Sequence, residues 1–165
     1  MIIISILSFF LDGIFSILCE KNSLLLALFS LCSLIVIYPF INDKYKLLFF
    51  SLGLGFSYDI IYTQTPLLYT ILFVLLGLFI MLYFRFIPHN IITSIFCTVL
   101  VIFLYRLLSY TCVVFINEYN FDFNEVLKSF YSSLISNLIY VVLIGSILKI
   151  YYKKKGKKKS YNYQI

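Results

Sequence analysis

Residues 52–69 read Leu-Gly-Leu-Gly-Phe-Ser-Tyr-Asp-Ile-Ile-Tyr-Thr-Gln-Thr-Pro-Leu-Leu-Tyr and join two apolar stretches across a short polar break. The break runs from Thr63 to Pro66, and a proline there suits the first turn of a new helix. Asp59 lies just before the break, within a run of mostly apolar and aromatic residues. The stretch therefore predicts two apolar helices joined by a tight turn, with a carboxylate near the end of the first.

The apolar character extends over all 165 residues. Apolar residues make up 62% of the chain and charged residues only 12%, and the mean hydropathy is +1.02. Soluble domains average about 45–50% apolar and about 25% charged residues. A soluble core of this size could not bury so many apolar side chains. We therefore expect an all-α, polytopic membrane protein.

Six segments are long and apolar enough to span a bilayer, which takes about 20 residues with roughly 17–25 tolerated. They predict a six-helix transmembrane domain over residues 1–152 and a basic tail over residues 153–165. Before the last span, Asp122 and Glu125 are spaced like a capping box at a helix start. The predicted spans are Met1–Leu18, Ser23–Ile41, Lys46–Tyr62, Leu67–Phe84, Ile91–Phe115 and Phe130–Ile150.

Basic residues fall mainly on one side of these spans, and cytoplasmic loops carry the excess of Lys and Arg. The other side holds only Lys21 and Lys128, so we expect the N- and C-termini to lie in the cytoplasm. Six tail lysines either contact anionic lipids or serve only as a topology anchor. The basic side comprises Lys44, Lys46, Arg85, Lys149, Lys153, Lys154, Lys155, Lys157, Lys158 and Lys159.

Three charged residues fall inside predicted spans: Asp12, Asp59 and Arg106. Such residues are costly in a membrane, and they usually face the bundle interior and pair. Counting along the helices places all three in the outer half of the membrane. We hypothesise that Arg106 pairs with Asp59, with Asp12 as the second candidate. The alternative is that each side chain snorkels toward the outer interface.

Glycines, a short internal similarity and the single histidine give weaker indications of structure and function. Gly53 and Gly55 predict close packing of the third helix, because small residues let transmembrane backbones approach. The segments that begin at Asp12 and Asp59 are weakly similar over five positions, too few to define a repeat. His89 is expected to be an interface residue. The sequence contains no recognisable catalytic motif or metal cluster, and we expect no enzymatic activity, metal or cofactor.

Residues 52–69 resemble the hallmark segment of the MreD family, the rod-shape-determining membrane proteins of bacteria. That family shows a Gly-rich third helix that ends in an aspartate, a short turn and an apolar fourth helix. Many members have a glycine in the turn where this chain has Pro66-Leu67-Leu68. Residues 9–15 also look like the first helix of Gram-positive members. The matching positions in the hallmark segment are Gly53, Gly55, Phe56, Asp59, Tyr62, Thr63, Thr65 and Pro66.

The resemblance implies a non-enzymatic scaffold or regulatory subunit of the cell-elongation machinery in the bacterial plasma membrane. MreD proteins associate with MreC, which bridges to the actin-like MreB and to the RodA-type peptidoglycan polymerase with its transpeptidase. On this view the outer loops and outer helix ends face MreC. Asp59 would then fix the outer end of the third helix and present the loop Thr63–Pro66, while Gly53 and Gly55 permit tight packing of that helix. Asp59 and the two glycines need not touch any substrate.

A substrate-binding subunit of an energy-coupling-factor vitamin transporter is the alternative function, since MreD proteins are similar to these subunits in fold. Those subunits resemble one another in an A-x-x-x-A coupling motif on the first helix. This chain has a single alanine, Ala27, in the second predicted span. It also lacks tryptophan, one common means of stacking an aromatic vitamin. The scaffold role is therefore the favoured hypothesis.

Overall fold

The structure is a computed structural model, and it describes residues 2–19, 27–41, 44–63, 67–117 and 121–154. Apart from short connections, these residues form helices, which confirms the all-α prediction. A 3-10 turn, η2 (Tyr38–Phe40), continues the second helix, and a π-helical turn, η3 (Asp59–Thr63), continues the third. The α-helices are α1 (Ile2–Cys19), α2 (Phe29–Ile37), α3 (Lys44–Tyr58), α4 (Leu68–Phe86), α5 (Ile91–Asn117) and α6 (Phe123–Lys154).

Three of the described helices are long and apolar enough to cross a membrane, namely those over residues 68–86, 91–116 and 123–151. Shorter apolar helices cover Ile3–Ser16 and Phe29–Phe40. The chain is therefore a multi-pass membrane protein. The predicted span Phe130–Ile150 is the middle of a longer helix that begins at Phe123, directly after the predicted cap. Asp122 accepts a hydrogen bond there from the Asn124 N–H at 2.9 Å.

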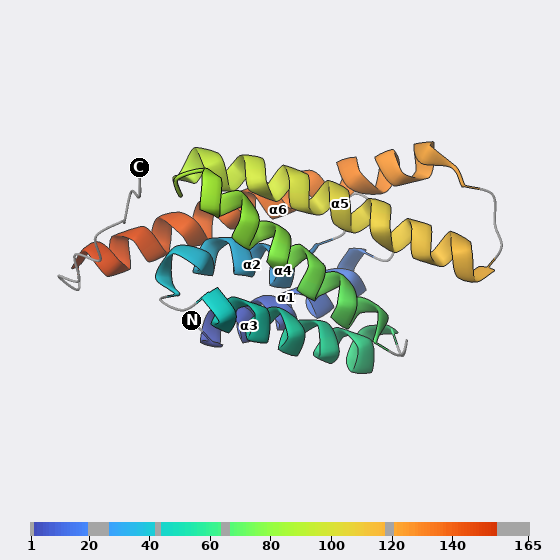
Figure 1. The fold of residues 1–165 in the computed structure, drawn as a ribbon, viewed down its shortest axis with the longest axis horizontal. Helices are drawn as coiled ribbons and strands as arrows, with labels where there is room; N and C mark the ends of the chain where they lie inside the picture. The colour runs from blue at the N-terminus through green and yellow to red at the C-terminus, as the bar shows by residue number, and fades with distance from the viewer. Residues whose placement is uncertain (1, 20–26, 42–43, 64–66, 118–120, 155–165) are drawn as a thin grey trace.

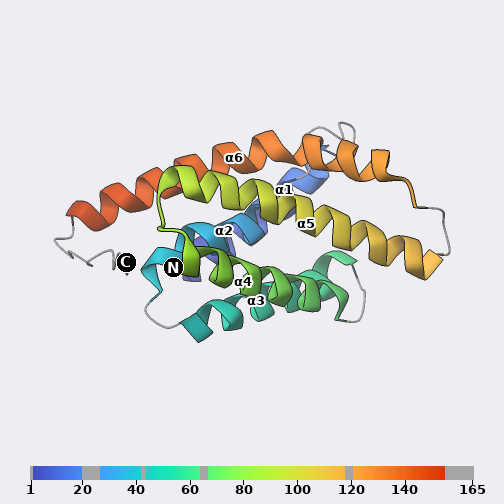
Figure 2. The same cartoon turned by 45° about the horizontal axis from the view of Figure 1, so that its top comes forward.

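The six helices alternate in direction, so that α1 begins and α6 ends at the same end of the bundle (Figures 1 and 2). α5 and α6 pack side by side. The end of α5 and the start of α6 project beyond the ends of α3 and α4 in both views (Figures 1 and 2). At 1.5 Å per residue these two helices are about 40 and about 48 Å long, longer than a hydrocarbon core of roughly 30 Å.

The short helix α2 lies at the centre of the bundle. All nine of its residues are buried, and it contacts α1, α3, α4, α5 and α6. A helix that is apolar all round belongs in a core rather than on a surface. The predicted span Ser23–Ile41 is therefore α-helical only from Phe29 in the part that the structure describes. The helix begins inside the protein, and its first N–H groups need partners there.

The packing of α3 against α4 depends on glycine at one of the two predicted positions. A Cβ on Gly55 would lie 2.7 Å from the Thr70 Cα and 2.8 Å from the Tyr69 carbonyl oxygen, so close packing is confirmed there. At Gly53 a Cβ would meet none of the described atoms within 4 Å. The prediction is wrong for Gly53, because this residue is on the exposed face of α3.

The two glycines provide a matched test of the packing. Gly55→Ala should lower the free energy of unfolding by about 1–3 kcal/mol, because the α4 backbone cannot move aside. Gly53→Ala should leave it unchanged or raise it by up to about 1 kcal/mol through helix propensity. Unfolding of the purified chain in mixed detergent micelles measures both changes. Equal stability of the two variants would contradict the packing.

Candidate functional site

Asp12, on α1, caps the start of α2. Its carboxylate accepts the Phe29 N–H at 2.6 Å and the Ser30 N–H at 2.9 Å. The Tyr58 hydroxyl, from α3, donates to the same carboxylate at 3.0 Å. Asp12 is only 3% exposed, so these donors replace the water that would otherwise solvate it. The carboxylate therefore joins three helices.

Asn137, on α6, completes this cap. Its Oδ1 accepts the Leu28 N–H at 2.9 Å, and its Nδ2 donates to the Ser133 carbonyl at 2.6 Å. The first four N–H groups of a helix have no partner within it. Side chains from α1 and α6 satisfy three of these four at the start of α2, since Leu28 is the residue before the helix. The start of α2 is thus held from two sides.

Asp59 caps the start of α4 in the same way. Its oxygens accept the Tyr69 N–H at 2.9 Å, the Thr70 N–H at 2.8 Å and the Thr70 hydroxyl at 2.6 Å. Leu67, which precedes α4, provides no side-chain cap and has a left-handed φ of 61°. The carboxylate of the preceding helix takes the place of the missing cap. Asp59 is also buried.

The two aspartates therefore have equivalent roles. Each carboxylate accepts two successive N–H groups at the start of the next helix, where the helix dipole favours negative charge. The weak similarity between residues 12–16 and 59–63 has this local structural counterpart. Capping explains why these two aspartates are buried, and the sequence alone did not predict this role for either of them.

Aromatic rings connect the two caps to Arg106. Tyr58 packs against Tyr69, with ring centroids 6.1 Å apart, and Tyr69 packs against Tyr105 at 6.3 Å. The Arg106 guanidinium carbon lies 5.6 Å from the centroid of the Tyr105 ring. A chain of aromatic contacts thus runs from the Tyr58 ring at the Asp12 cap to the Tyr105 ring beside Arg106. The specific pairing of Arg106 with Asp59 stays a prediction.

For the remaining predicted site residues, either the residue or its side chain lies outside the part of the chain that the structure describes. Thr63 is the last residue of η3, and its side chain is not described. Pro66 lies outside the described residues, and so do the tail lysines Lys155, Lys157, Lys158 and Lys159. Lys153 and Lys154 continue α6, and their side chains are not described.

Two important residues of the site were missed in the sequence. Asn137 is an amide within a predicted span, and such residues commonly hydrogen-bond between transmembrane helices. The sequence therefore contained a signal that could have identified Asn137. Tyr58 gave no comparable signal, because a tyrosine beside an aspartate is unremarkable among fifteen tyrosines. Its bond to Asp12 spans 46 residues of sequence.

His89 lies in the loop between α4 and α5, at the opposite end of the bundle from Asp59. Its Nε2 is 3.0 Å from the Ser94 hydroxyl, and its ring packs against Phe84 with centroids 4.9 Å apart. Burial lowers the pKa of the imidazole below its ordinary value near 6.5. The ring therefore packs at helix ends in its neutral form at pH 7.

The capped layer holds neighbouring helices together. Both carboxylates act as hydrogen-bond acceptors for backbone amides. Among the described residues, no three His, Cys, Asp or Glu side chains are grouped so that they could hold a metal ion. No protein-family model, curated protein or solved structure matches the chain. The functional argument therefore depends on geometry and on the sequence resemblance.

Removing a buried cap should cost more than removing an exposed one. Asp12→Ala and Asp59→Ala should each lower the free energy of unfolding by at least about 2 kcal/mol, because two buried amides lose their acceptor. Asp122→Ala is the matched control, since water can replace this exposed cap at a cost of about 0.5–1 kcal/mol. Denaturation in detergent gives the three values. The capping roles would be refuted by equal losses at all three positions.

His89 should titrate below pH 6.5. Near and below pH 6.5 the unfolded chain binds a proton on this ring more readily than the folded chain does. The free energy of unfolding should therefore fall as the pH drops below about 6.5. The chain contains one histidine, so NMR of histidine-labelled protein follows this ring alone. His89→Gln should remove this part of the pH dependence. A titration midpoint at or above 6.5 would be inconsistent with the buried ring.

Proposed function

We propose that the chain is a non-enzymatic scaffold of the bacterial cell-elongation machinery, of the MreD type. It would act with MreC, and through MreC with MreB and the RodA-type polymerase and transpeptidase. Its place would be the plasma membrane, with six spans and both termini in the cytoplasm. The observation that carries the proposal is the cap that Asp59 forms on α4. This cap fixes the segment on which the family resemblance depends.

The resemblance concerns a helix that ends in an aspartate, a turn and a following helix. In this chain the Asp59 carboxylate bonds the two amides that open the second helix of that unit, and Gly55 allows the same two helices to touch. The aspartate and the glycine at these positions thus serve one purpose, which is to hold α3 and α4 together. Two helices that are held together in this way suit a scaffold.

The backbone of the turn also supports the proposal. Leu67 is the one residue other than glycine with a positive φ in the described part of the chain. Left-handed backbone costs an ordinary residue roughly 1–2 kcal/mol, and glycine adopts it freely. Many family members have a glycine within the three positions that here are Pro66, Leu67 and Leu68. A turn with this backbone accounts for that preference.

The projecting end of α5 and α6 provides a surface for a partner. Phe115 is 87% exposed and Ile116 64% exposed, and Phe121 and Phe123 on the facing side are about half exposed. The rings of Tyr110 and Phe121 pack across the junction at 5.4 Å. Exposed apolar patches of this kind mark sites of interaction with proteins or membranes. This end lies opposite the lysine-rich end and would face outward, toward MreC.

The distribution of charge supports the proposed orientation. α1 begins and α6 ends at the end of the bundle where α3 also begins (Figure 1), and Lys44, Lys46 and Lys149 belong to these helix ends. Asp122 and Glu125 open α6 at the other end. Cytoplasmic ends carry the excess of basic residues. An even number of crossings would leave both termini there.

Affinity purification of the tagged chain from gently solubilised membranes tests the proposal. We expect MreC to be recovered with the wild-type chain. Phe115→Ala should reduce its recovery severalfold by removing an exposed ring from the partner surface. Phe86→Ala is the matched control, because Phe86 is 80% exposed at the opposite end, and it should leave recovery unchanged.

Two results would contradict the scaffold role. Recovery of an ATPase pair with a membrane coupling protein, in place of MreC, would identify a transporter subunit. Recovery of MreC that falls equally with Phe115→Ala and Phe86→Ala would refute the assigned surface.

A further inference from the structure

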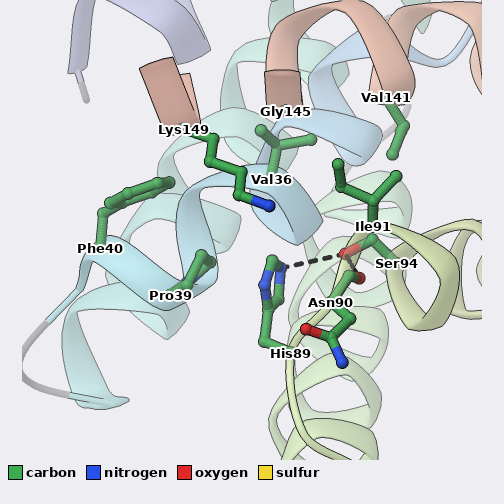
Figure 3. Close-up of a pocket in the computed structure, with 10 residues that line it drawn as sticks. All are labelled: Val36, Pro39, Phe40, His89, Asn90, Ile91, Ser94, Val141, Gly145 and Lys149. Carbon is green, nitrogen blue, oxygen red and sulfur yellow. Dashed lines mark hydrogen bonds between the residues drawn. The ribbon is translucent and has the colours of Figure 1, made fainter. Parts of the chain in front are cut away.

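A cavity of about 130 Å³ lies at the end of the bundle opposite the two aspartate caps. It is open on one side and is lined by η2, the loop before α5, the start of α5 and the C-terminal part of α6. Val36 and Val141 form apolar walls, and Pro39 lies along one side (Figure 3). A cavity of about 150 Å³ accepts a benzene ring, so a phosphate group has room in this one.

The polar groups of the cavity gather on one side. Lys149 reaches from α6 toward the His89 ring, and Ser94 lies next to that ring (Figure 3). The Ser94 hydroxyl is 3.0 Å from His89 Nε2 and donates to the Asn90 carbonyl at 2.9 Å. Because the hydroxyl proton is used for Asn90, Nε2 is the donor in its bond to Ser94.

The charge of the lining favours an anion. The ten described residues that line the cavity include Lys149 and contain neither Asp nor Glu. A lysine ammonium offers three donors and no acceptor. In addition, α5 begins beside the cavity at Ile91, and the start of a helix carries a partial positive charge.

We propose that this cavity binds a phosphate group, with the Lys149 ammonium pairing with its charge and the Ser94–His89 pair forming the polar side of the site beside it. The same end of the bundle bears the start of α3 with Lys44 and Lys46, and in the sequence six lysines follow Lys149. The phosphate belongs either to the headgroup of an anionic lipid or to a free phosphate ion. The proposal does not depend on the scaffold role.

Histidine-labelled full-length chain in a neutral detergent provides a direct probe, because its single imidazole signal comes from the cavity. Inorganic phosphate and dioleoylphosphatidylglycerol are titrated separately, with dioleoylphosphatidylcholine as the neutral lipid. We expect a saturable shift of the His89 signal with at least one of the two phosphate probes. A shift with phosphatidylglycerol alone assigns the site to lipid, and a shift with inorganic phosphate shows that the free ion suffices.

Matched variants separate the cavity from general attraction to a basic end. Lys149→Gln should weaken the response at least tenfold, and Lys149→Arg should keep it. Lys46→Gln removes one exposed lysine near the same end and should leave the response unchanged. The proposal would be overturned by no saturable shift with either probe, by an equal shift with phosphatidylcholine, or by equal weakening in Lys149→Gln and Lys46→Gln. Thermal unfolding of each variant verifies that it is folded.

Discussion

The fold depends on supplying partners for the amides that open α2. This helix begins among other apolar helices, where water cannot satisfy its N–H groups and an unsatisfied group costs several kcal/mol. Asp12 on α1 and Asn137 on α6 accept hydrogen bonds from those amides. Both side chains are directional, so they fix the height and rotation of α2 relative to α1 and α6. A shift by one turn, about 5.4 Å, would leave the amides and the carboxylate without partners.

The second cap, formed by Asp59, joins α3 to α4 in the same way. A carboxylate within a membrane is expensive, about 2.5–3.5 kcal/mol at a helix centre on insertion scales, and charge-assisted hydrogen bonds offset that cost. Asp12 and Asp59 each receive three such bonds. Tyr58 donates to Asp12 and directly precedes Asp59, so the two caps share one layer. We infer that this layer holds α3 against α4, as the proposed scaffold requires.

The sequence predicted the helical fold well, because apolar length and polar breaks depend only on neighbouring residues. It also located Asp12, Asp59 and Gly55, since charge and small size are conspicuous in apolar runs. It could not assign the capping roles, because Asp12 and its amides are 17 and 18 residues apart and the central position of α2 is a tertiary property. Gly53 was grouped with Gly55 because spacing alone does not reveal which face of α3 meets α4.

Amide hydrogen exchange of the reconstituted chain, followed residue by residue by NMR, tests the central claim most directly. The account predicts that Phe29, Ser30, Tyr69 and Thr70 exchange slowly although they open their helices. In Asp12→Ala, Phe29 and Ser30 should lose protection while Tyr69 and Thr70 keep it. Rapid exchange of all four amides in the wild-type chain, at the rate of solvent-exposed helix starts, would contradict the account.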